Sequence, residues 1–321
     1  MKEDMPVTLK TVDHVEITTL IDNYVDLLLP PSDIVTRPPI IKAGKILADT
    51  LLAEHGLSLL VTVYKDENKH TILFDTGYTK VGVLHNVEQL GIDLEAIEAI
   101  VLSHGHMDHT GSLYAILDHL PGPVPVVVHP GAFHHPRYTR GPDGSLRQWP
   151  RTLVKDDLEQ TNAEIIESKT PILIADNLVM VTGEVERTTG FEKGFPNALM
   201  EKNGEKVQDP IADDQSIVMN LNGKGLVVIS GCAHAGIVNT VEFARKTTGE
   251  QKVHAVLGGF HLTGPFFEKI HDETIQELKK MKPEIVIPMH CTGWKAIQRF
   301  AQEFPSSFIL NSVGSKVTLT A

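Results

Sequence analysis

Short apolar runs recur along the chain, and many of them are rich in the β-branched residues that favour strands. Strands are predicted at residues 7–19, 57–64, 71–74, 99–103, 124–129, 172–175, 178–182, 216–221, 226–230, 253–257, 284–288, 308–310 and 316–319. Amphipathic stretches with the period of a helix lie between several of these runs. Helices are predicted at residues 81–90, 94–98, 112–120, 237–247, 268–281 and 295–304.

The order of these elements predicts an α+β fold. Strand pairs dominate the first third, whereas strands and helices alternate toward the C-terminus, so both parts can share one core. We expect a single domain over residues 1–321, built from two packed mixed β-sheets with helices on their outer faces. Polar stretches rich in glycine, proline, arginine and histidine predict an irregular insertion around residues 130–215, and long loops of this kind are commonly functional.

Composition narrows the range of partners. The 321 residues include 29 basic and 41 acidic side chains, which gives a net charge of −12. Such a chain lacks the positive charge that binds nucleic acid or an anionic membrane, so we expect neither partner. The two cysteines suit a reducing compartment, and residues 1–17 lack the apolar segment of a signal peptide. We therefore expect a cytoplasmic protein that acts on a small-molecule substrate, with homodimer formation left open.

The densest chemical feature is the motif H-x-H-x-D-H, formed by His104, His106, Asp108 and His109 directly after the predicted strand at 99–103. Imidazole and carboxylate ligands together suit zinc, iron or manganese. Residues two apart on a strand share a face, so His104 and His106 can bind one ion, while the next two can reach a second. The alternative is a polar turn with solvent-facing histidines, which the density of the motif disfavours.

The order of strand, glycine and histidine recurs three more times, at His234, His261 and His290. Ligands gather outside the carboxyl ends of parallel strands, so these histidines are expected to meet the first motif in one pocket. We expect His234 and His290 to be metal ligands. His261 is expected to act as a ligand or as a catalytic residue that contacts the substrate.

The chemistry of such a site favours hydrolysis. A cation held by neutral imidazoles keeps positions open for water, and it can lower the pKa of that water from ~15.7 toward ~7. Asp108 could bind the ion, orient the water or accept its proton, and it is therefore also a catalytic candidate. Asp75 follows the predicted strand at 71–74 and could orient a ligand histidine through the other ring nitrogen.

These motifs, with Phe-Asp-Thr-Gly at residues 74–77, resemble the metallo-β-lactamase superfamily. Residues 230–239, 258–262 and 290–293 are similar to one branch, the 7,8-dihydropterin-6-methyl-4-(β-D-ribofuranosyl)aminobenzene-5'-phosphate synthase-like proteins. The resemblance spans residues 57–293. It implies an αββα four-layer sandwich with one or two metal ions, zinc above all, at one edge of the sheets. It also implies metal-ligand roles for the residues His104, His106, Asp108, His109 and His290.

The sequence departs from that family in the middle of the chain. Many family hydrolases have a histidine before one strand and an aspartate after the next. Here Asp214 precedes the predicted strand at 216–221, while Cys232 and His234 follow the strand at 226–230. We expect His234 to complete the first site. Cys232 and Asp214 remain alternatives for the residue that lies between the two ions.

Several weaker candidates remain. Three further residues could contact the substrate or support a ligand, and for the first two a solvated turn is an equal alternative: Glu184, Arg187 and Thr292. Four arginines of the insertion could bind phosphate through paired N–H donors, although a solvated loop is favoured for them: Arg137, Arg140, Arg147 and Arg151. Three histidines of the insertion are assigned mainly to loop roles: His129, His134 and His135.

The sequence leaves four functions in competition. The first is a metal-dependent hydrolase of a small phosphorylated or heteroaromatic molecule. The second, implied by the branch, is a synthase that joins a pterin alcohol diphosphate to an arylamine ribose phosphate, with the metals stabilising the leaving diphosphate. The others are a di-iron redox protein and a non-catalytic sensor or binding protein on the same fold.

Overall fold

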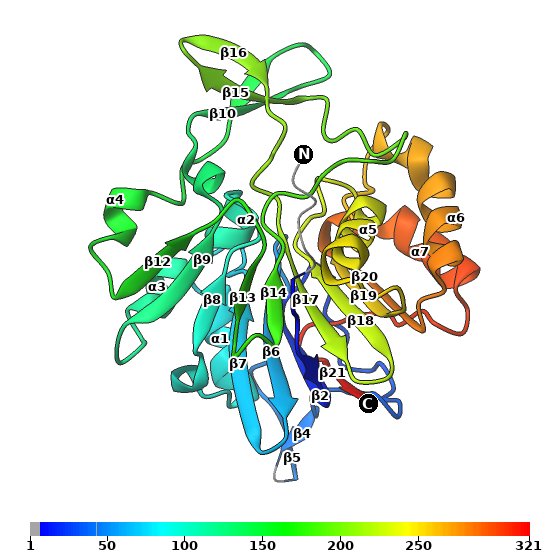
Figure 1. Cartoon of the computed structure of the whole chain (residues 1–321). Coiled ribbons are helices and arrows are strands. Elements are labelled where there is room, and N and C mark those ends of the chain that lie inside the picture. Colours follow the sequence, from blue (N-terminus) through cyan, green and yellow to red (C-terminus); the bar gives the residue numbers. More distant parts are fainter. Residues whose placement is uncertain (1–6, 43) are drawn as a thin grey trace.

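The computed structural model describes residues 7–42 and 44–321. Two large β-sheets pack face to face, and helices cover the outer face of each (Figure 1). The helices are α1 Gly82–Leu90, α2 Met107–Thr110, α3 Leu113–Leu117, α4 Lys155–Leu158, α5 Ile237–Thr248, α6 His271–Met281 and α7 Trp294–Glu303. Short 3₁₀ helices are Leu94–Ala96, Pro130–Phe133, Phe267–Ile270 and His290–Thr292. Within the described ranges, every helix is too short or too polar to traverse a lipid bilayer.

The first sheet has eight strands. They are β2 His14–Ile21, β3 Val35–Thr36, β6 Ser58–Lys65, β7 Asn68–Phe74, β8 Ala99–Val101, β9 Val124–Val128, β12 Ala163–Glu167 and β21 Lys316–Thr320. Their order in the sheet is β12-β9-β8-β7-β6-β2-β21-β3. The strands from β12 to β7 are parallel, whereas those from β7 to β3 pair antiparallel, so the sheet is mixed as predicted.

The second sheet has seven strands. They are β1 Thr11–Val12, β13 Ile172–Ile174, β14 Val179–Val181, β17 Ser216–Leu221, β18 Gly225–Ser230, β19 Val253–Gly259 and β20 Ile285–Met289. The order is β13-β14-β17-β18-β19-β20, with β1 parallel to β17. Strands β18, β19 and β20 are parallel, and their helices α5, α6 and α7 lie together on the outer face (Figure 1).

Three apolar layers hold these four layers of structure together. Along β18, Val227 and Ile229 pack between the sheets, whereas Leu226 and Val228 pack under α5–α7. On the first sheet, apolar side chains of the outer face pack against α1 and α3. Successive strand residues point to opposite faces, so continuous apolar runs are what a sheet buried on both sides requires. The predicted αββα sandwich is therefore confirmed.

The prediction of irregular structure around residues 130–215 is wrong for two parts of this range, residues 137–148 and 198–208. Two hairpins pair there into a separate four-stranded antiparallel sheet, in the order β11-β10-β15-β16. Its strands are β10 Arg137–Arg140, β11 Leu146–Gln148, β15 Ala198–Lys202 and β16 Glu205–Gln208. These strands are short and mostly polar, so no apolar period reveals them. This small sheet lies beyond one edge of the sandwich (Figure 1).

Other differences from the prediction are small. The predicted strand at 7–19 is divided, because β1 joins the second sheet and β2 joins the first. The predicted strand at 308–310 is only an isolated bridge between Phe308 and Val286. A further short hairpin, β4 Ile41–Lys42 with β5 Lys45–Ile46, was not predicted.

One edge of the sandwich collects the ends of many strands. In the first sheet β7 and β8 end there, and β2 does too, because β2 and β7 are both antiparallel to β6. In the second sheet the parallel strands β18, β19 and β20 end at the same edge. The turns after these strands contain the predicted site residues.

Candidate metal centre

Each predicted metal-binding segment lies in a turn after one of these strands. The H-x-H-x-D-H motif follows β8 and includes α2, while His234, His261 and His290 follow β18, β19 and β20. Strands of both sheets thus supply the site. The structure brings the imidazoles together as the sequence pattern predicted.

The first cluster consists of His104, His106 and His234, all buried. Nε2 of His104 lies 2.9 Å from Nδ1 of His106. The ring of His234 lies with its centroid 4.9 Å from that of His104 and 5.0 Å from that of His106. The sulfur of Cys232 belongs to the same group, since the donor atoms of Cys232, His104 and His234 lie within 4.8 Å of one another.

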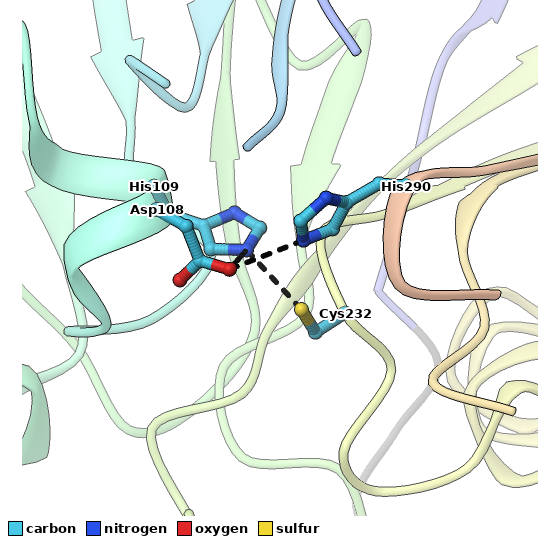
Figure 2. A group of neighbouring side chains, drawn as sticks. All are labelled: Asp108, His109, Cys232 and His290. Carbon is cyan, nitrogen blue, oxygen red and sulfur yellow. Dashed lines mark hydrogen bonds and ion pairs between the residues drawn. The ribbon is translucent and has the colours of Figure 1, made fainter. Parts of the chain in front are cut away.

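The second cluster consists of Asp108, His109, His290 and Cys232, whose donor atoms also lie within 4.8 Å of one another. Figure 2 shows these side chains pointing toward a common centre. Oδ2 of Asp108 lies 3.3 Å from Nε2 of His290 and 3.8 Å from Nε2 of His109. The thiol of Cys232 lies 3.1 Å from the same nitrogen of His109.

Cys232, and not Asp214, is the residue that adjoins both clusters. Asp214 is buried beneath the turn, where its Oδ2 accepts the backbone N–H of Ala235 at 2.9 Å. Burial raises the pKa of Asp214 to about 6, although backbone N–H groups partly offset this effect. Of the two alternatives that the sequence left open, Cys232 has the position between the clusters, whereas Asp214 supports the turn that presents Cys232 and His234.

The donor set fits a metal ion. Buried polar atoms normally have hydrogen-bond partners. Here both ring nitrogens of His234 and Nδ1 of His261 have no hydrogen-bond partner among the described residues. Several imidazoles, one carboxylate and one thiol are also the ligand types that zinc prefers, with iron or manganese as alternatives for the nitrogen and oxygen donors.

The protonation states of the first cluster agree with metal binding. Burial and neighbouring imidazoles lower the pKa of His104, His106 and His234 well below the usual value, so these rings are neutral at pH 7. A neutral ring is the form that binds a cation. Burial opposes the charged form of His109, but the carboxylates of Asp75 and Asp108 raise its pKa to about 9. Without an ion this ring is therefore protonated at pH 7, and a cation that binds it would displace a proton.

Asp75 orients His109, as the sequence analysis proposed for this carboxylate. Its Oδ2 lies 2.6 Å from Nδ1 of His109, and the same atom accepts the hydroxyl of Ser103 at 2.7 Å. Its Oδ1 accepts the Ser103 backbone N–H at 2.6 Å. The φ angles of Asp75, His261 and His290 are 61°, 42° and 47°, a region that residues other than glycine seldom adopt. Such strained residues concentrate at functional sites.

The sequence analysis missed the residues that hold His290. Oδ1 of Asn23 accepts from Nδ1 of that ring at 3.0 Å, and Asp22 accepts the His290 backbone N–H at 2.9 Å. Both follow β2, which ends at the same edge as β7. His55 was missed as well, and its Nε2 lies 3.7 Å from Oδ2 of Asp108. For Asp22 and Asn23 the available signal was a polar turn after a strand, the same signal that revealed Asp75, whereas His55 precedes the strand β6 and gave no such signal.

Arg137 is not solvated, contrary to the favoured interpretation. Its guanidinium is buried and pairs with Asp213 at 2.6 Å and with Asp209 at 3.2 Å. Oδ2 of Asp213 in turn accepts the backbone N–H of Gly105 at 2.9 Å, inside the H-x-H segment. Asp213 thus connects β10 to the turn that contains His104 and His106.

A cavity of about 490 Å³ opens above the two clusters. Its floor contains Asp108, Cys232 and His261, and its roof is formed by the hairpin β10–β11. Aromatic side chains line much of the wall: Trp149, Phe195, Phe266 and Phe267. The Trp149 ring lies 3.9 Å from the ring of His106, centroid to centroid. The volume is typical of a site for a small molecule.

Three weaker candidates do not face this cavity. Glu184 lines a separate cavity of about 500 Å³, together with His129 and His134. Arg187 donates to the backbone carbonyls of Pro210 at 2.6 Å and His234 at 3.2 Å, so it supports the His234 turn. The buried Thr292 hydroxyl accepts the backbone N–H of Phe260 at 3.0 Å, a contact within the scaffold.

Comparison with known proteins places this site in a family. A model described as the metallo-beta-lactamase superfamily matches residues 54–245. The chain is 35% identical over 259 residues to a 7,8-dihydropterin-6-methyl-4-(beta-D-ribofuranosyl)-aminobenzene-5'-phosphate synthase of Methanocaldococcus jannaschii, a match that covers 80% of this chain and 87% of that protein. An uncharacterized protein of the same organism is 33% identical over 279 residues, which cover 84% of this chain and 97% of that protein.

The fold has a close counterpart among solved structures. The crystal structure of Tm1679, described as a metal-dependent hydrolase of the beta-lactamase superfamily, matches with a TM-score of 0.71 and 25% sequence identity over 96% of this chain and 100% of that chain. The predicted resemblance to the superfamily, and to the synthase-like branch, is confirmed by these matches. The chain belongs to the metallo-β-lactamase superfamily.

Proposed function

We propose that the protein is a metal-dependent hydrolase of a small substrate that carries a phosphate group or a heteroaromatic ring. The observation that carries this proposal is the pair of donor clusters that share Cys232 beneath a cavity of about 490 Å³. A solved relative with a TM-score of 0.71 is described as a metal-dependent hydrolase, which supports the same reaction class. The donor types favour zinc, in one or two ions.

His104, His106 and His234 would hold one cation, and Asp108, His109 and His290 would hold a second. Cys232 belongs to both donor groups and could serve either cation. When bound, such cations lower the pKa of a coordinated water and polarise a carbonyl or phosphoryl oxygen. The protein contributes neutral imidazoles that keep the positive charge of the ion, and a partly apolar cavity that excludes bulk water from the substrate.

Asp108 is the residue placed to move a proton. Burial alone would raise the pKa of its carboxyl group, but the charge on His109 and the hydrogen bond from His290 hold that pKa far below the usual value. Asp108 is therefore ionised at neutral pH. Since it also lines the cavity, it can accept a proton from a nucleophile bound between the clusters.

His261 is placed to contact the substrate. It lines the cavity, and its Nδ1 has no partner among the described residues. The rings of Phe195 and Phe267 lie at centroid distances of 5.5 and 4.7 Å from it and fix its orientation. His261 can therefore hold a polar group of the substrate, or protonate a leaving oxygen, at a fixed place above the clusters.

A second candidate is a synthase, and a specific observation favours it. The relative from M. jannaschii that is 35% identical over most of both chains is a 7,8-dihydropterin-6-methyl-4-(beta-D-ribofuranosyl)-aminobenzene-5'-phosphate synthase. In that reaction the same clusters would stabilise a leaving diphosphate, and Asp108 would accept a proton from the attacking group. The two candidates share the site and differ in whether water is the nucleophile.

Product analysis separates the two candidates. The metal-loaded protein is incubated with a panel of phosphomonoesters, phosphodiesters and lactones, and separately with a dihydropterin methyl diphosphate plus a ribofuranosylaminobenzene 5'-phosphate. Hydrolysis of a panel member, lost in His106→Ala, supports the hydrolase. A coupled product detected by mass spectrometry, with no panel turnover, supports the synthase instead.

Metal analysis tests the premise that both candidates share. Mass spectrometry of the purified protein is expected to find one or two equivalents of zinc, with iron or manganese as the alternatives. Two equivalents of iron with reversible redox behaviour would favour a di-iron redox protein. A protein that binds no transition metal, even after incubation with zinc, would favour a non-catalytic role.

A further inference from the structure

A third group of donor atoms lies in the wall of the same cavity. It consists of the thiols of Cys232 and Cys291 and one ring nitrogen of His261, and these three atoms lie within 4.8 Å of one another. All three residues line the cavity of about 490 Å³, so an ion that enters the cavity can reach them. They are here called the thiol site. Cys291 belongs to neither of the two clusters described above.

Three neighbouring strands of the second sheet bring the thiol site together. Cys232 follows β18, His261 follows β19, and Cys291 lies in the short 3₁₀ helix that follows β20. The segments after β18 and β20 meet across the end of β19, where Sγ of Cys291 lies 3.7 Å from the backbone carbonyl oxygen of Cys232. The two cysteines are 59 positions apart in the sequence, so only the order of the strands makes them neighbours.

Gly259, the last residue of β19, makes this approach possible. A methyl group at Gly259 would lie 2.7 Å from Sγ of Cys291 and 2.3 Å from the backbone carbonyl oxygen of Gly231. Both distances are well below the ~3.5–4.0 Å of a favourable contact between carbon atoms. A side chain at this position would therefore displace the Cys291 thiol or the turn that contains Cys232, whereas glycine leaves room for both.

The donors of the thiol site are available for an ion. Both cysteines are buried and have free thiols. Nδ1 of His261 is buried without a hydrogen-bond partner among the described residues, although buried polar atoms normally have one. The rings of Phe195 and Phe267 pack against His261 at centroid distances of 5.5 and 4.7 Å, so its imidazole is held in place beside the thiols.

The composition of the thiol site differs from that of the two clusters. Each cluster has one thiol among nitrogen and oxygen donors, whereas two of the three donors of the thiol site are sulfur. Soft thiolate ligands select Cu(I), while imidazole and carboxylate ligands suit zinc, iron and manganese. The thiol site and the clusters should therefore prefer different cations.

We propose that Cys232, Cys291 and His261 form a third metal site, selective for a soft cation, Cu(I) above all. One Cu(I) ion would have two sulfur ligands and one nitrogen ligand. Each thiol releases its proton to solvent when it binds, and copper stays in the +1 state throughout, so no electron is transferred. The site is independent of which reaction the two clusters catalyse, because the ion and its ligand Cys291 belong to neither cluster.

Metal affinities of the metal-free, full-length protein test this site without any reaction. Copper is kept as Cu(I) with ascorbate under anaerobic conditions, and its affinity is measured by competition with a chromophoric Cu(I) chelator. Zinc affinity is measured in the same way with a zinc chelator. Cys291→Ser is expected to lower the Cu(I) affinity at least about 100-fold, because loss of a partner outside the ligand set already costs about 10- to 100-fold. Its zinc affinity should match that of the parent.

The matched control is His104→Ala, which removes a donor of the first cluster and leaves all three donors of the thiol site. Its zinc affinity should fall, while its Cu(I) affinity should equal that of the parent. The two variants thus have opposite effects on the two metals. Equal Cu(I) affinities in Cys291→Ser and the parent, or no Cu(I) binding by the parent, would overturn the proposal.

A measurement on the parent decides the question even if a variant fails to fold. X-ray absorption at the copper edge, on protein with equimolar Cu(I), should show two sulfur ligands and one nitrogen ligand. In His261→Phe the nitrogen ligand should be lost and both sulfur ligands kept. A parent spectrum with one sulfur ligand or none would place the ion in one of the clusters and refute the third site.

Discussion

Two histidines of the second cluster are oriented by side chains that contact the ring nitrogen directed away from the cluster. Asp75 holds Nδ1 of His109, and Asn23 contacts Nδ1 of His290, so each ring presents Nε2 to the second cluster. Partners of this kind orient metal-binding histidines and raise their basicity. Substitution of a supporting residue should therefore change metal affinity, as substitution of a donor would.

Asp75→Asn is expected to weaken zinc binding about 10- to 100-fold, the usual effect of losing such a supporting carboxylate. The variant keeps the size of the side chain but removes the negative charge 2.6 Å from His109. Zinc affinity is measured by competition with a chromophoric chelator. Asp49→Asn, at an exposed aspartate, is the control. Equal zinc affinity in Asp75→Asn and the parent would show that Asp75 does not support His109 in this way.

Gly111 is required because the backbone of Tyr78 passes too close for a side chain. A methyl group at Gly111 would lie 1.9 Å from the Tyr78 carbonyl oxygen. Gly111→Ala is therefore expected to lower the free energy of unfolding by about 1–3 kcal/mol or more, the range for overpacking. Urea denaturation measures the change. At Gly122 no described atom lies within 4 Å of such a methyl group, so Gly122→Ala should be nearly neutral.

At the level of single residues, the sequence predicted the side chains that could bind a metal but not Asp22 and Asn23, which hold His290 in place. The H-x-H-x-D-H motif is local, and so is the repeated order of strand, glycine and histidine. In contrast, Asp22 and Asn23 lie 268 and 267 positions before His290 and meet it only because β2 and β20 end at one edge. A contact over such a separation depends on the packing of both sheets, which no local pattern contains.

Among the elements, helix α5 has an unusual N-terminus. Its first turn lacks a local side-chain cap, and the carboxylate of the buried Glu192 accepts the backbone N–H groups of Val238 at 3.0 Å and Asn239 at 2.8 Å instead. Free N–H groups of a first turn need such an acceptor. A residue of a distant loop thus caps the helix that follows the His234 turn.

The pH dependence of stability should reveal this cap. Burial raises the pKa of Glu192 to about 7, although the helix N–H groups oppose the shift. The folded protein then keeps a proton that the unfolded chain releases near pH 4.5. Stability falls as the pH rises from about 4.5 to about 7, because the unfolded state binds fewer protons over this range.

Glu192→Gln removes this titration, so its free energy of unfolding should fall less than that of the parent between pH 5 and pH 8, by up to about 3 kcal/mol. Urea denaturation at several pH values measures the difference between the two proteins. Glu186→Gln, at an exposed glutamate, should follow the parent curve. Parallel curves for Glu192→Gln and the parent would contradict a raised pKa.

Elements buried on both faces were the most predictable. The runs at 99–103, 226–230 and 253–257 each contain four apolar residues in five, and they became β8, β18 and β19. The hairpin of β10 and β11 and its partner strands were missed, because β10 pairs with a strand far along the chain, β15, and both are short and only partly buried. Their apolar content is too low to reveal a period, so their pairing follows from tertiary contacts.

At the scale of the whole molecule, the site without a bound ion lowers the free energy of unfolding. Several buried ring nitrogens there have no partner among the described residues, and unpaired buried polar atoms are costly. The donors also come from both sheets, so a bound ion would connect layers that otherwise meet through apolar side chains. Binding to the folded state alone raises the free energy of unfolding.

Removal of metal by a chelator is therefore expected to lower Tm, and added zinc should restore it. With free zinc at about a hundred times its Kd, the gain in free energy of unfolding is ~2.7 kcal/mol. Differential scanning calorimetry of metal-free and zinc-loaded protein measures the shift. His104→Ala/His290→Ala, which removes one donor from each cluster, should lose most of it. An equal zinc-dependent shift in that variant would place the stabilising ion elsewhere.

The position of β21 has a consequence for protein synthesis. This last strand lies between β2 and β3, two of the earliest, and the edge of β2 that it covers leads to Asp22 behind His290. While the ribosome extends the chain, that edge stays open to wrong partners until residues 316–320 emerge. Assembly of the site must then wait for this strand, and a truncation that removes residues 316–320 should cost the site as well as the sheet.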